Sequence, residues 1–268
     1  MRAYLAGDSC VTPFGEYARY YDLLYADKDY AAETAFVREI IRRLAPGART
    51  LLELGCGSAR HAVELVRSDF TVTGVDLSAQ MIARAHEQIT QLPLELRGRI
   101  KLMQADATRF VSATSFDAVA SLFHVINYQT TNDALSGIFR SARAALETDG
   151  IFIFDFWYGP AVLSEHPQVR IKRINIGQLS LTRIAEPNLD INRNVVDVNY
   201  TLIVVDRAGK RVEEIKEVHS VRYLFLPEIE LLAAANGFEI TESGEWLTGN
   251  PLHPRSWSGY AVARPTPS

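Results

Sequence analysis

Cysteine is nearly absent from this chain, which contains Cys10 and Cys56 and no other thiol in 268 residues. Two cysteines so far apart offer neither the paired spacing of a zinc site nor that of a redox centre, and a disulfide framework is not expected. Such sparing use of cysteine is typical of a reducing compartment. We therefore expect the protein to act in the cytoplasm.

Long apolar runs and excess positive charge are missing too. No stretch reaches the roughly 18 apolar residues that a membrane span needs, and the opening MRAYLAGDSC lacks the apolar core of a signal peptide. Lys and Arg number 28 against 32 Asp and Glu, so the net charge is −4. Neither a membrane nor a nucleic acid is therefore expected as a partner. The six histidines are scattered, and no metal site is expected.

What is present is an alternation of short apolar segments with amphipathic ones. Strands are predicted at 50–54, 70–76, 99–104, 116–122 and 151–156. Helices are predicted twice within 15–45, at about 59–67, from the N-cap Ser78, and at about 131–147. Strands that alternate with helices of this length indicate a parallel sheet covered by helices on both faces.

The pattern changes after Trp157. Polar and apolar residues then alternate over 169–175, 179–185, 195–206 and 212–225, with a turn at 206–209. This alternation predicts an antiparallel sheet inserted into the α/β domain. A helix from Pro227 to about Asn236 and two closing strands, FEITESG and WSGYAVAR, then complete the main sheet.

The predicted fold is therefore α/β, with a Rossmann-like, doubly wound, seven-stranded and mostly parallel sheet and an inserted antiparallel β lid. The core is expected to comprise residues 1–156 and 226–268, and the lid residues 157–225.

The most informative stretch joins the first strand to the first helix, where Glu53, Gly55 and Gly57 fit the pattern acidic-x-Gly-x-Gly. Small residues let a ligand approach the backbone, and the free N–H groups of a helix start can bind a carboxylate. Asp76 ends the second strand, where a carboxylate can accept ribose hydroxyls. Asp106 follows the third strand, where it can accept an adenine amino group.

A dinucleotide site is the main alternative for such a turn. It requires Gly-x-Gly-x-x-Gly/Ala, and here Arg60 occupies the third position, where its side chain would crowd the pyrophosphate. A doubly wound domain whose glycines only make a turn is the other alternative. The positions of Asp76 and Asp106 at the ends of the two strands after the turn favour S-adenosylmethionine (SAM).

On these motifs the chain resembles the class I SAM-dependent methyltransferases over nearly its whole length. More narrowly, it is similar to the N-methyltransferases of nucleotide-linked amino sugars and their relatives in polysaccharide gene clusters. The segments that carry the resemblance are YYDLLYADKDY, LLELGCGSARH, VTGVDLSAQM, LFHVINY, FIFDFWY and EVHSVRYLF. Ala59, where the family pattern has a third glycine, is one departure. His124 is another, because Tyr128 can align instead with a histidine of the sugar enzymes.

The resemblance implies SAM as cofactor and a small-molecule acceptor, such as a nucleotide sugar, bound between core and lid; it leaves room for a homodimer. Together with the turn, it assigns the cofactor to Tyr21, Tyr30, Glu53, Gly55, Gly57, Asp76, Leu77, Met81, Asp106, Ala107 and Leu122. For the tyrosines and for Met81, ordinary core packing is the alternative.

Candidates for the reaction itself come from the end of the fourth strand and from the lid. His124, Tyr128 and His219 are expected as proton acceptors, because an amine must lose its proton before it can attack a methyl group. Trp157, Tyr158, Glu217, Arg222 and Arg255 are expected to contact the acceptor. A solvated sheet face or simple surface charge would produce the same residues.

The reaction expected is N-methylation of an amino sugar carried on a nucleotide. O-methylation of a sugar, or of another small-molecule hydroxyl or carboxylate, is the alternative within the class. A dinucleotide reductase conflicts with Arg60, and a SAM-binding protein without activity conflicts with so large a lid.

Overall fold

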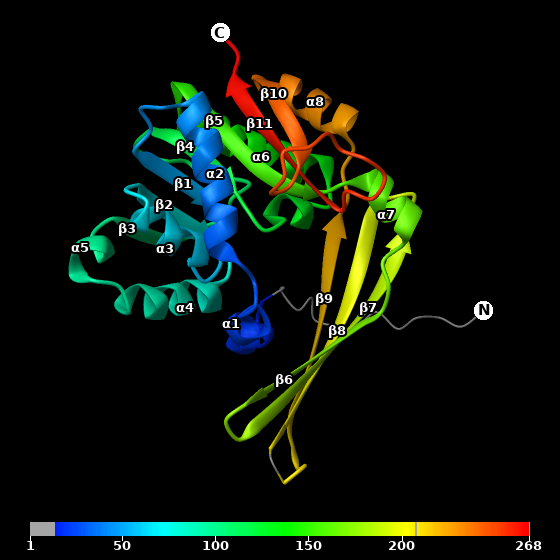
Figure 1. The fold of residues 1–268 in the computed structure, drawn as a ribbon. Coiled ribbons are helices and arrows are strands. Elements are labelled where there is room, and N and C mark those ends of the chain that lie inside the picture. The colour runs from blue at the N-terminus through cyan, green and yellow to red at the C-terminus, as the bar shows by residue number, and fades with distance from the viewer. Residues whose placement is uncertain (1–13, 207, 268) are drawn as a thin grey trace.

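The computed structural model describes residues 14–206 and 208–267. The opening stretch examined for a signal peptide, Cys10, and Arg207 in the expected lid turn lie outside the described residues. The described chain forms one large mixed sheet with its helices, from which a second, antiparallel sheet projects (Figure 1).

The main sheet has seven strands in the order β10-β11-β5-β4-β1-β2-β3. Strands β1 to β5 are parallel to one another, whereas β11 runs antiparallel to both β5 and β10. The prediction of a seven-stranded, mostly parallel sheet is thus confirmed. The strands are β1 (Thr50–Leu54), β2 (Thr71–Asp76), β3 (Ile100–Gln104), β4 (Phe116–Ser121), β5 (Leu146–Trp157), β10 (Phe238–Glu245) and β11 (Ser258–Pro265).

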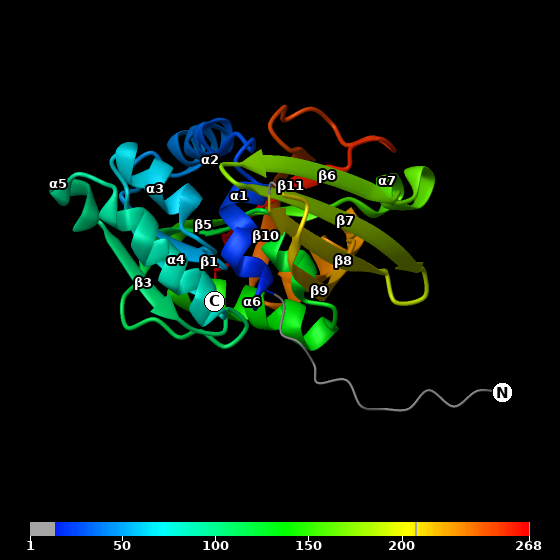
Figure 2. The same ribbon diagram turned by 90° about the horizontal axis from the view of Figure 1, so that it is seen from below.

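Helices cover both faces of this sheet because alternate strand residues point to opposite sides. Leu51 lies in a core cluster with residues of α2 and α3, while its neighbour Leu52 lies in a second cluster with residues of α6 and α8. Figure 2 shows α2 and α3 on one side and α6 on the other. The helices are α2 (Tyr30–Leu44), α3 (Arg60–Arg67), α4 (Ala79–Thr90), α5 (Leu94–Arg97), α6 (Asn132–Ala145) and α8 (Leu226–Ala235).

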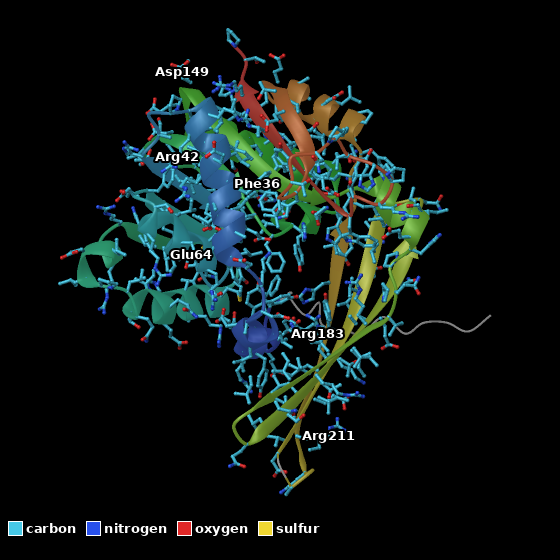
Figure 3. All side chains as sticks on the ribbon, in the orientation of Figure 1. Phe36, Arg42, Glu64, Asp149, Arg183 and Arg211 are labelled. Carbon is cyan, nitrogen blue, oxygen red and sulfur yellow. The ribbon has the colours of Figure 1, made fainter. Side chains whose placement is uncertain are left out.

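The lid is a four-stranded antiparallel sheet in the order β6-β7-β8-β9. Long hairpins carry it away from the core, and Arg211 lies near its far tip (Figure 3). One face of the lid is apolar, which explains the alternation in the sequence; Leu181, Leu202 and Ile215 are buried on it. The strands are β6 (Arg170–Ile176), β7 (Leu179–Asp190), β8 (Val195–Asp206) and β9 (Arg211–Arg222).

Several boundaries differ from the prediction; in the lid, β7 extends to Asp190 instead of ending at 185, and β9 ends at Arg222 instead of 225. Helix α6 ends at Ala145 and β5 begins at Leu146, because Leu146 is buried and pairs with Phe116. Trp157, expected as the first lid residue, is the last residue of β5 and pairs with Ser258. A short helix, α7 (Gly159–Glu165), precedes the lid; at seven residues it is too short for a helical period to be recognised.

The segment of residues 14–25, called the N-terminal segment below, joins the lid to the core. It contains a 3-10 helix, η1 (Tyr17–Tyr20), and the short α1 (Tyr21–Leu24). On the lid side, Glu217 accepts the backbone N–H of Phe14 at 3.0 Å. On the core side, Asp22 accepts the hydroxyl of Ser58 at 2.7 Å. The segment thereby connects the glycine turn to lid strand β9.

Candidate functional site

The glycine turn after β1 uses conformations that side chains disfavour. Gly55 has φ +79° and Gly57 has φ +54°. A Cβ atom on Gly55 would lie 2.3 Å from Cγ1 of Val125, so only glycine fits there. Ala59 also adopts a left-handed conformation, with φ +62°, and N-caps α3. Alanine in place of the third glycine therefore costs about 1–2 kcal/mol but preserves the turn.

Asp76 holds this turn from the end of β2. Its carboxylate accepts the backbone N–H groups of Gly57 and Ser78, each at 2.9 Å. Burial raises the pKa of the Asp76 carboxyl. Asp106, past β3, uses one oxygen to accept the N–H of Thr108 at 2.8 Å and its hydroxyl at 2.7 Å. The structure therefore gives both aspartates a role in shaping their loops, beyond the ligand contacts expected of them.

Glu53 is the buried acid of the motif, with 1% of its surface exposed. One oxygen lies 3.5 Å from Nδ1 of His61, while the other has no hydrogen-bond partner among the described residues. A buried acceptor without a partner is costly and indicates a missing donor. The ammonium group of SAM is such a donor, so this part of the site fits the expected cofactor.

Behind Glu53 lies a buried ion-pair network that the sequence reasoning missed. Nε2 of His61 lies 2.8 Å from a carboxylate oxygen of Glu33. Glu33 also pairs with Lys28 and accepts the indole N–H of Trp246 at 3.2 Å. Burial disfavours a charged ring, but hydrogen bonds to the two glutamates raise the pKa of His61 to about 9. His61 therefore stays protonated at neutral pH and links Glu53 to α2.

This network predicts a pH-dependent stability. The raised pKa of His61 stabilises the fold fully below its unfolded value of about 6.5, and this contribution is lost as the pH rises through about 9. Wild-type protein should therefore lose on the order of 3 kcal/mol of unfolding free energy across this range. In a His61→Gln variant this decline should be absent, as measured by urea denaturation at several pH values.

His86→Gln is the matched control, because His86 is exposed on α4. It should keep the wild-type pH profile. Parallel pH profiles for wild type and His61→Gln would show that His61 is not the charged centre of the network.

At the acid end, the pKa of Glu33 is lowered to about 2, against the effect of its burial, by His61 and Lys28. Its contribution is present above about pH 4.5 and should be lost as the pH falls toward 2.

The remaining predicted cofactor residues surround the turn on several elements. Met81 lies in the first turn of α4, which Ser78 caps as predicted, and a Cβ on Gly57 would come within 3.3 Å of it. Leu77 is 59% exposed beside Asp76, which suits a residue that a ligand would cover. Of the others, Leu122, Tyr21 and Tyr30 are buried and Ala107 is half-buried, and their contact with the cofactor stays a prediction.

His124 lies at the carboxyl end of β4 in a strained loop. Phe123 and His124 both have φ +62°, and Val125 next to them packs against Gly55. Asp155, buried on β5, accepts the backbone N–H of His124 at 3.0 Å, and its other oxygen lies 2.8 Å from Nδ1 of the ring. The imidazole therefore lies beside the glycine turn next to a carboxylate, although its Nδ1 makes no hydrogen bond among the described residues.

Asp155 was not among the predicted residues. Its signal in the sequence is a lone acid inside the apolar strand IFIFDF, at a position where burial demands a partner.

The structure joins three predicted residues from distant parts of the sequence. The Tyr128 hydroxyl lies 3.0 Å from Nδ1 of His219, and Nε2 of His219 lies 3.1 Å from a carboxylate oxygen of Glu217. A neutral ring protonated on Nε2 donates to Glu217 and accepts from Tyr128. Burial raises the pKa of Tyr128 well above its usual value, so its hydroxyl keeps its proton at neutral pH.

His219 itself is 3% exposed, among the rings of Phe14, Tyr17 and Tyr200. Its ring therefore has little surface for direct contact with an acceptor, whereas its partner Tyr128 is half-buried. Glu217 likewise supports His219 and the N-terminal segment. Burial opposes its charge, yet the hydrogen bond to His219 lowers the pKa of Glu217.

Of the other residues expected to contact the acceptor, two are aromatic residues at the end of β5 and two are arginines. Trp157 lies near His124, with ring centres 6.2 Å apart, and packs on Trp257 at 5.5 Å. Tyr158 is half-buried against the core. Arg222 is already bound to Glu228 and Asn132, away from the face of β9 that carries His219. Arg255 is exposed in the loop before β11. A contact of the two arginines with the acceptor stays a prediction.

Arg183 is an additional basic group on the inner face of the lid. Its guanidinium donates to the hydroxyls of Tyr17 and Tyr25, each at 3.3 Å, and its Nε is buried without a partner among the described residues. It lies between α1 and the lid strands (Figure 3). No group of three or more metal-binding side chains occurs within residues 14–206 and 208–267. Over the same residues, no helix is long and apolar enough to cross a membrane.

Comparisons with known proteins agree with this geometry. Residues 51–150 match the family described as a methyltransferase domain. The dTDP-3-amino-3,4,6-trideoxy-alpha-D-glucopyranose N,N-dimethyltransferase of Streptomyces venezuelae is 26% identical over 238 residues, covering 88% of this chain and 94% of that enzyme.

Two solved structures are similar over nearly the whole chain. A sugar N-methyltransferase from a Streptoalloteichus species has a TM-score of 0.76 at 25% identity and covers 98% of both chains. A SAM-bound amino pentose methyltransferase from Micromonospora echinaspora has a TM-score of 0.72 at 25% identity, covering 95% of this chain and 98% of the other. The similarity therefore includes the lid as well as the core.

Proposed function

We propose that this chain, a class I SAM-dependent methyltransferase, methylates the amino group of a sugar carried on a nucleotide. The observation that carries the proposal is the extent of the similarity to the Streptomyces venezuelae enzyme, which covers 88% of this chain. A match confined to the core would support only the cofactor, because the core is common to methyltransferases of many substrates. A match that includes the lid also supports the acceptor.

The glycine turn, Glu53 and Asp76 would hold SAM, with Asp106 beside the adenine. When bound, SAM supplies an electrophilic methyl group for an in-line displacement. Such a reaction needs mainly alignment of the two reactants, which can contribute about 7–11 kcal/mol in favourable cases. The task left to this chain is to position the acceptor and to remove its proton.

Two groups at the carboxyl edge of the sheet can take that proton. His124 is 20% exposed and backed by Asp155, so its ring can accept a proton from an ammonium group while the carboxylate stabilises the charge. The Tyr128 hydroxyl can exchange a proton with the acceptor and pass it to His219, which Glu217 supports. In this proposal Tyr128 and His124 touch the acceptor, and His219 is a positioning residue.

Purified protein incubated with SAM and a panel of nucleotide sugars tests the proposal. Each sugar is offered in two forms that differ only in an amino or a hydroxyl group at one carbon, and products are weighed by mass spectrometry. Amino forms should gain one or two methyl groups, and the hydroxyl forms none. Methylation of the hydroxyl forms alone would replace the proposal with O-methylation. Size-exclusion chromatography of the same sample checks for the homodimer, which stays a prediction.

Asp76→Ala should weaken SAM binding by about 1.5–3 kcal/mol, because hydrogen bonds to a charged acceptor are lost. Isothermal titration calorimetry measures the change. Asp69→Ala, two residues before the start of the same strand, is the control and should bind SAM normally. Because Asp76 also holds the Gly57 N–H, Asp76→Asn should retain part of the affinity. Wild-type affinity in a folded Asp76→Ala protein would exclude the ribose role.

A further inference from the structure

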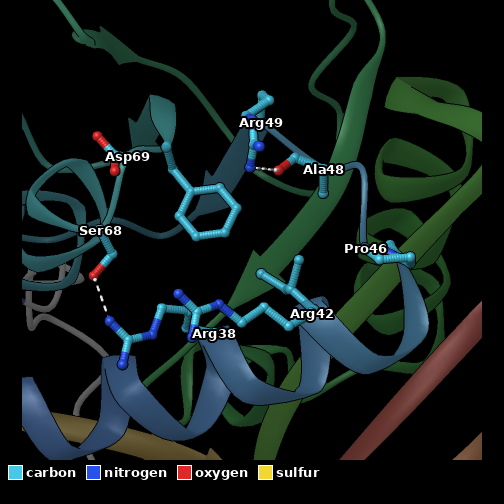
Figure 4. A pocket seen from close by; sticks show the side chains of 10 residues that line it. Arg38, Arg42, Pro46, Ala48, Arg49, Ser68 and Asp69 are labelled. Carbon is cyan, nitrogen blue, oxygen red and sulfur yellow. Dashed lines mark hydrogen bonds between the residues drawn. The ribbon is translucent and has the colours of Figure 1, made fainter.

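A hollow of about 390 Å³ opens at the amino ends of the parallel strands, on the opposite side of the sheet from the glycine turn at their carboxyl ends. It lies where the end of α2 meets the starts of β1 and β2 (Figure 4). Its apolar floor includes Ile41 and Phe70, both buried. Three arginines, Arg38, Arg42 and Arg49, line it, although the chain as a whole carries a net charge of −4.

These three arginines lack the carboxylate partners that arginines usually have. None of them has an acidic oxygen within 4.0 Å among residues 14–206 and 208–267. Arg38 donates only to the Ser68 hydroxyl at 3.3 Å, and its Nε is buried without a partner in the same part of the chain. Arg49 donates to a backbone carbonyl, that of Ala48, at 3.3 Å (Figure 4).

The nearby acids are engaged elsewhere. Asp69, on the rim, pairs with Arg99 at 3.0 Å. Asp117 accepts the backbone N–H groups of Arg49 and Thr50, each at 2.8 Å, and so ties down the start of β1. The Arg49 charge acts on the Asp117 carboxylate and helps to lower its pKa against the effect of burial, whereas Arg38 and Arg42 have no acidic oxygen within 4.0 Å in the described part of the chain. Like charges gathered beside an apolar floor repel one another unless an anion joins them.

We propose that this hollow binds the phosphate or pyrophosphate group of a small molecule. The planar guanidinium forks of three arginines match phosphate oxygens, and the buried Nε of Arg38 would gain an acceptor. The volume accommodates a pyrophosphate with room for more of its bearer. The hollow lies at the amino end of β2, whereas Asp76 lies at its carboxyl end. A ligand in the hollow therefore does not compete with SAM.

Calorimetric titration of the full-length protein with sodium pyrophosphate, at constant ionic strength in chloride, tests this proposal. Wild type should bind one pyrophosphate, and Arg38→Gln/Arg42→Gln should bind it at least tenfold more weakly. Arg67→Gln on α3 is the control, because Arg67 is an exposed arginine already paired with Glu64; it should bind like wild type. Arg42→Gln alone, at an exposed position, serves if the double variant does not fold.

Two further titrations identify the source of the phosphate. Inorganic phosphate tests a free ion, and UDP tests a nucleotide. The natural ligand belongs to the class of whichever compound binds wild type more tightly and loses that affinity in the arginine variants. Equal binding of pyrophosphate to wild type and to the arginine variants, or no binding to wild type, would overturn the proposal. Saturating SAM should leave the pyrophosphate affinity unchanged within about twofold, and competition between the two would place the ligand in the cofactor site instead.

Discussion

A Gly57→Val variant should bind SAM at least about 100-fold more weakly than wild type, a loss of about 2.7 kcal/mol or more. Gly57 has φ +54°, a region that β-branched residues rarely adopt. Its N–H is held by Asp76, and a Cβ there would come within 3.3 Å of Met81. A branched side chain therefore occupies the place where the cofactor must approach the backbone. Calorimetric titration with SAM measures the loss.

Gly177→Val separates cofactor occlusion from backbone strain. Gly177 lies in the turn between β6 and β7 with φ +55°, and nothing lies within 4 Å of a Cβ built on it. Valine at either glycine therefore introduces the same backbone strain, but only Gly57 lies in the cofactor turn. Gly177→Val should bind SAM like wild type. Normal SAM binding by Gly57→Val would place the cofactor away from this turn.

The lid should affect turnover rather than cofactor binding. His219→Ala is expected to lower turnover about 100-fold or more, while SAM affinity stays within about threefold. The reason is that His219 supports the Tyr128 hydroxyl and contacts the rings of the N-terminal segment, whereas Asp76 holds the glycine turn. Steady-state kinetics with the acceptor found by the panel, together with SAM titration, measures both quantities.

Tyr128→Phe refines this prediction because it keeps the ring and removes only the hydroxyl. It should lose turnover to a similar degree and alter the pH profile of kcat, which a purely structural role would not do. Val218→Ala, at an exposed neighbouring position on the opposite face of β9, should leave both quantities unchanged. Full turnover in His219→Ala would make the lid a structural surface. Loss of SAM affinity as well would mean that the lid closes on the cofactor.

Much of the fold could be predicted because its signals are local. The strand at 195–206 was located to the residue, since a half-buried strand alternates polar and apolar side chains along its whole length. Ser78 was recognised as a helix cap because capping depends on one side chain and the following turn. The start of β5 was missed because it is set by pairing with the distant Phe116, and α7 was missed because seven residues are too few to show a helical period.

The candidate site divides in the same way. Gly55, Gly57 and Asp76 could be predicted because a turn conformation and a strand end are encoded locally. Tyr128 and His219 are 91 residues apart in the sequence. Each could therefore be predicted as a site residue, but their hydrogen bond could not. Asp155, Glu33 and His61 were missed because their roles depend on burial among partners from other elements. Arg222 and His219 were both expected near the acceptor; strand alternation puts their side chains on opposite faces of β9.

The identity of the atom that receives the methyl group most directly tests whether this protein is an N-methyltransferase. SAM labelled with ¹³C at its methyl carbon, incubated with the enzyme and the amino form of its best nucleotide sugar, gives a product whose methyl signal is read by NMR. We expect the labelled carbon to correlate with the sugar's amino-bearing carbon, as an N-methyl or N,N-dimethyl group. A labelled carbon correlated with a hydroxyl-bearing carbon, or a label that never leaves SAM in the presence of any amino sugar, would contradict it.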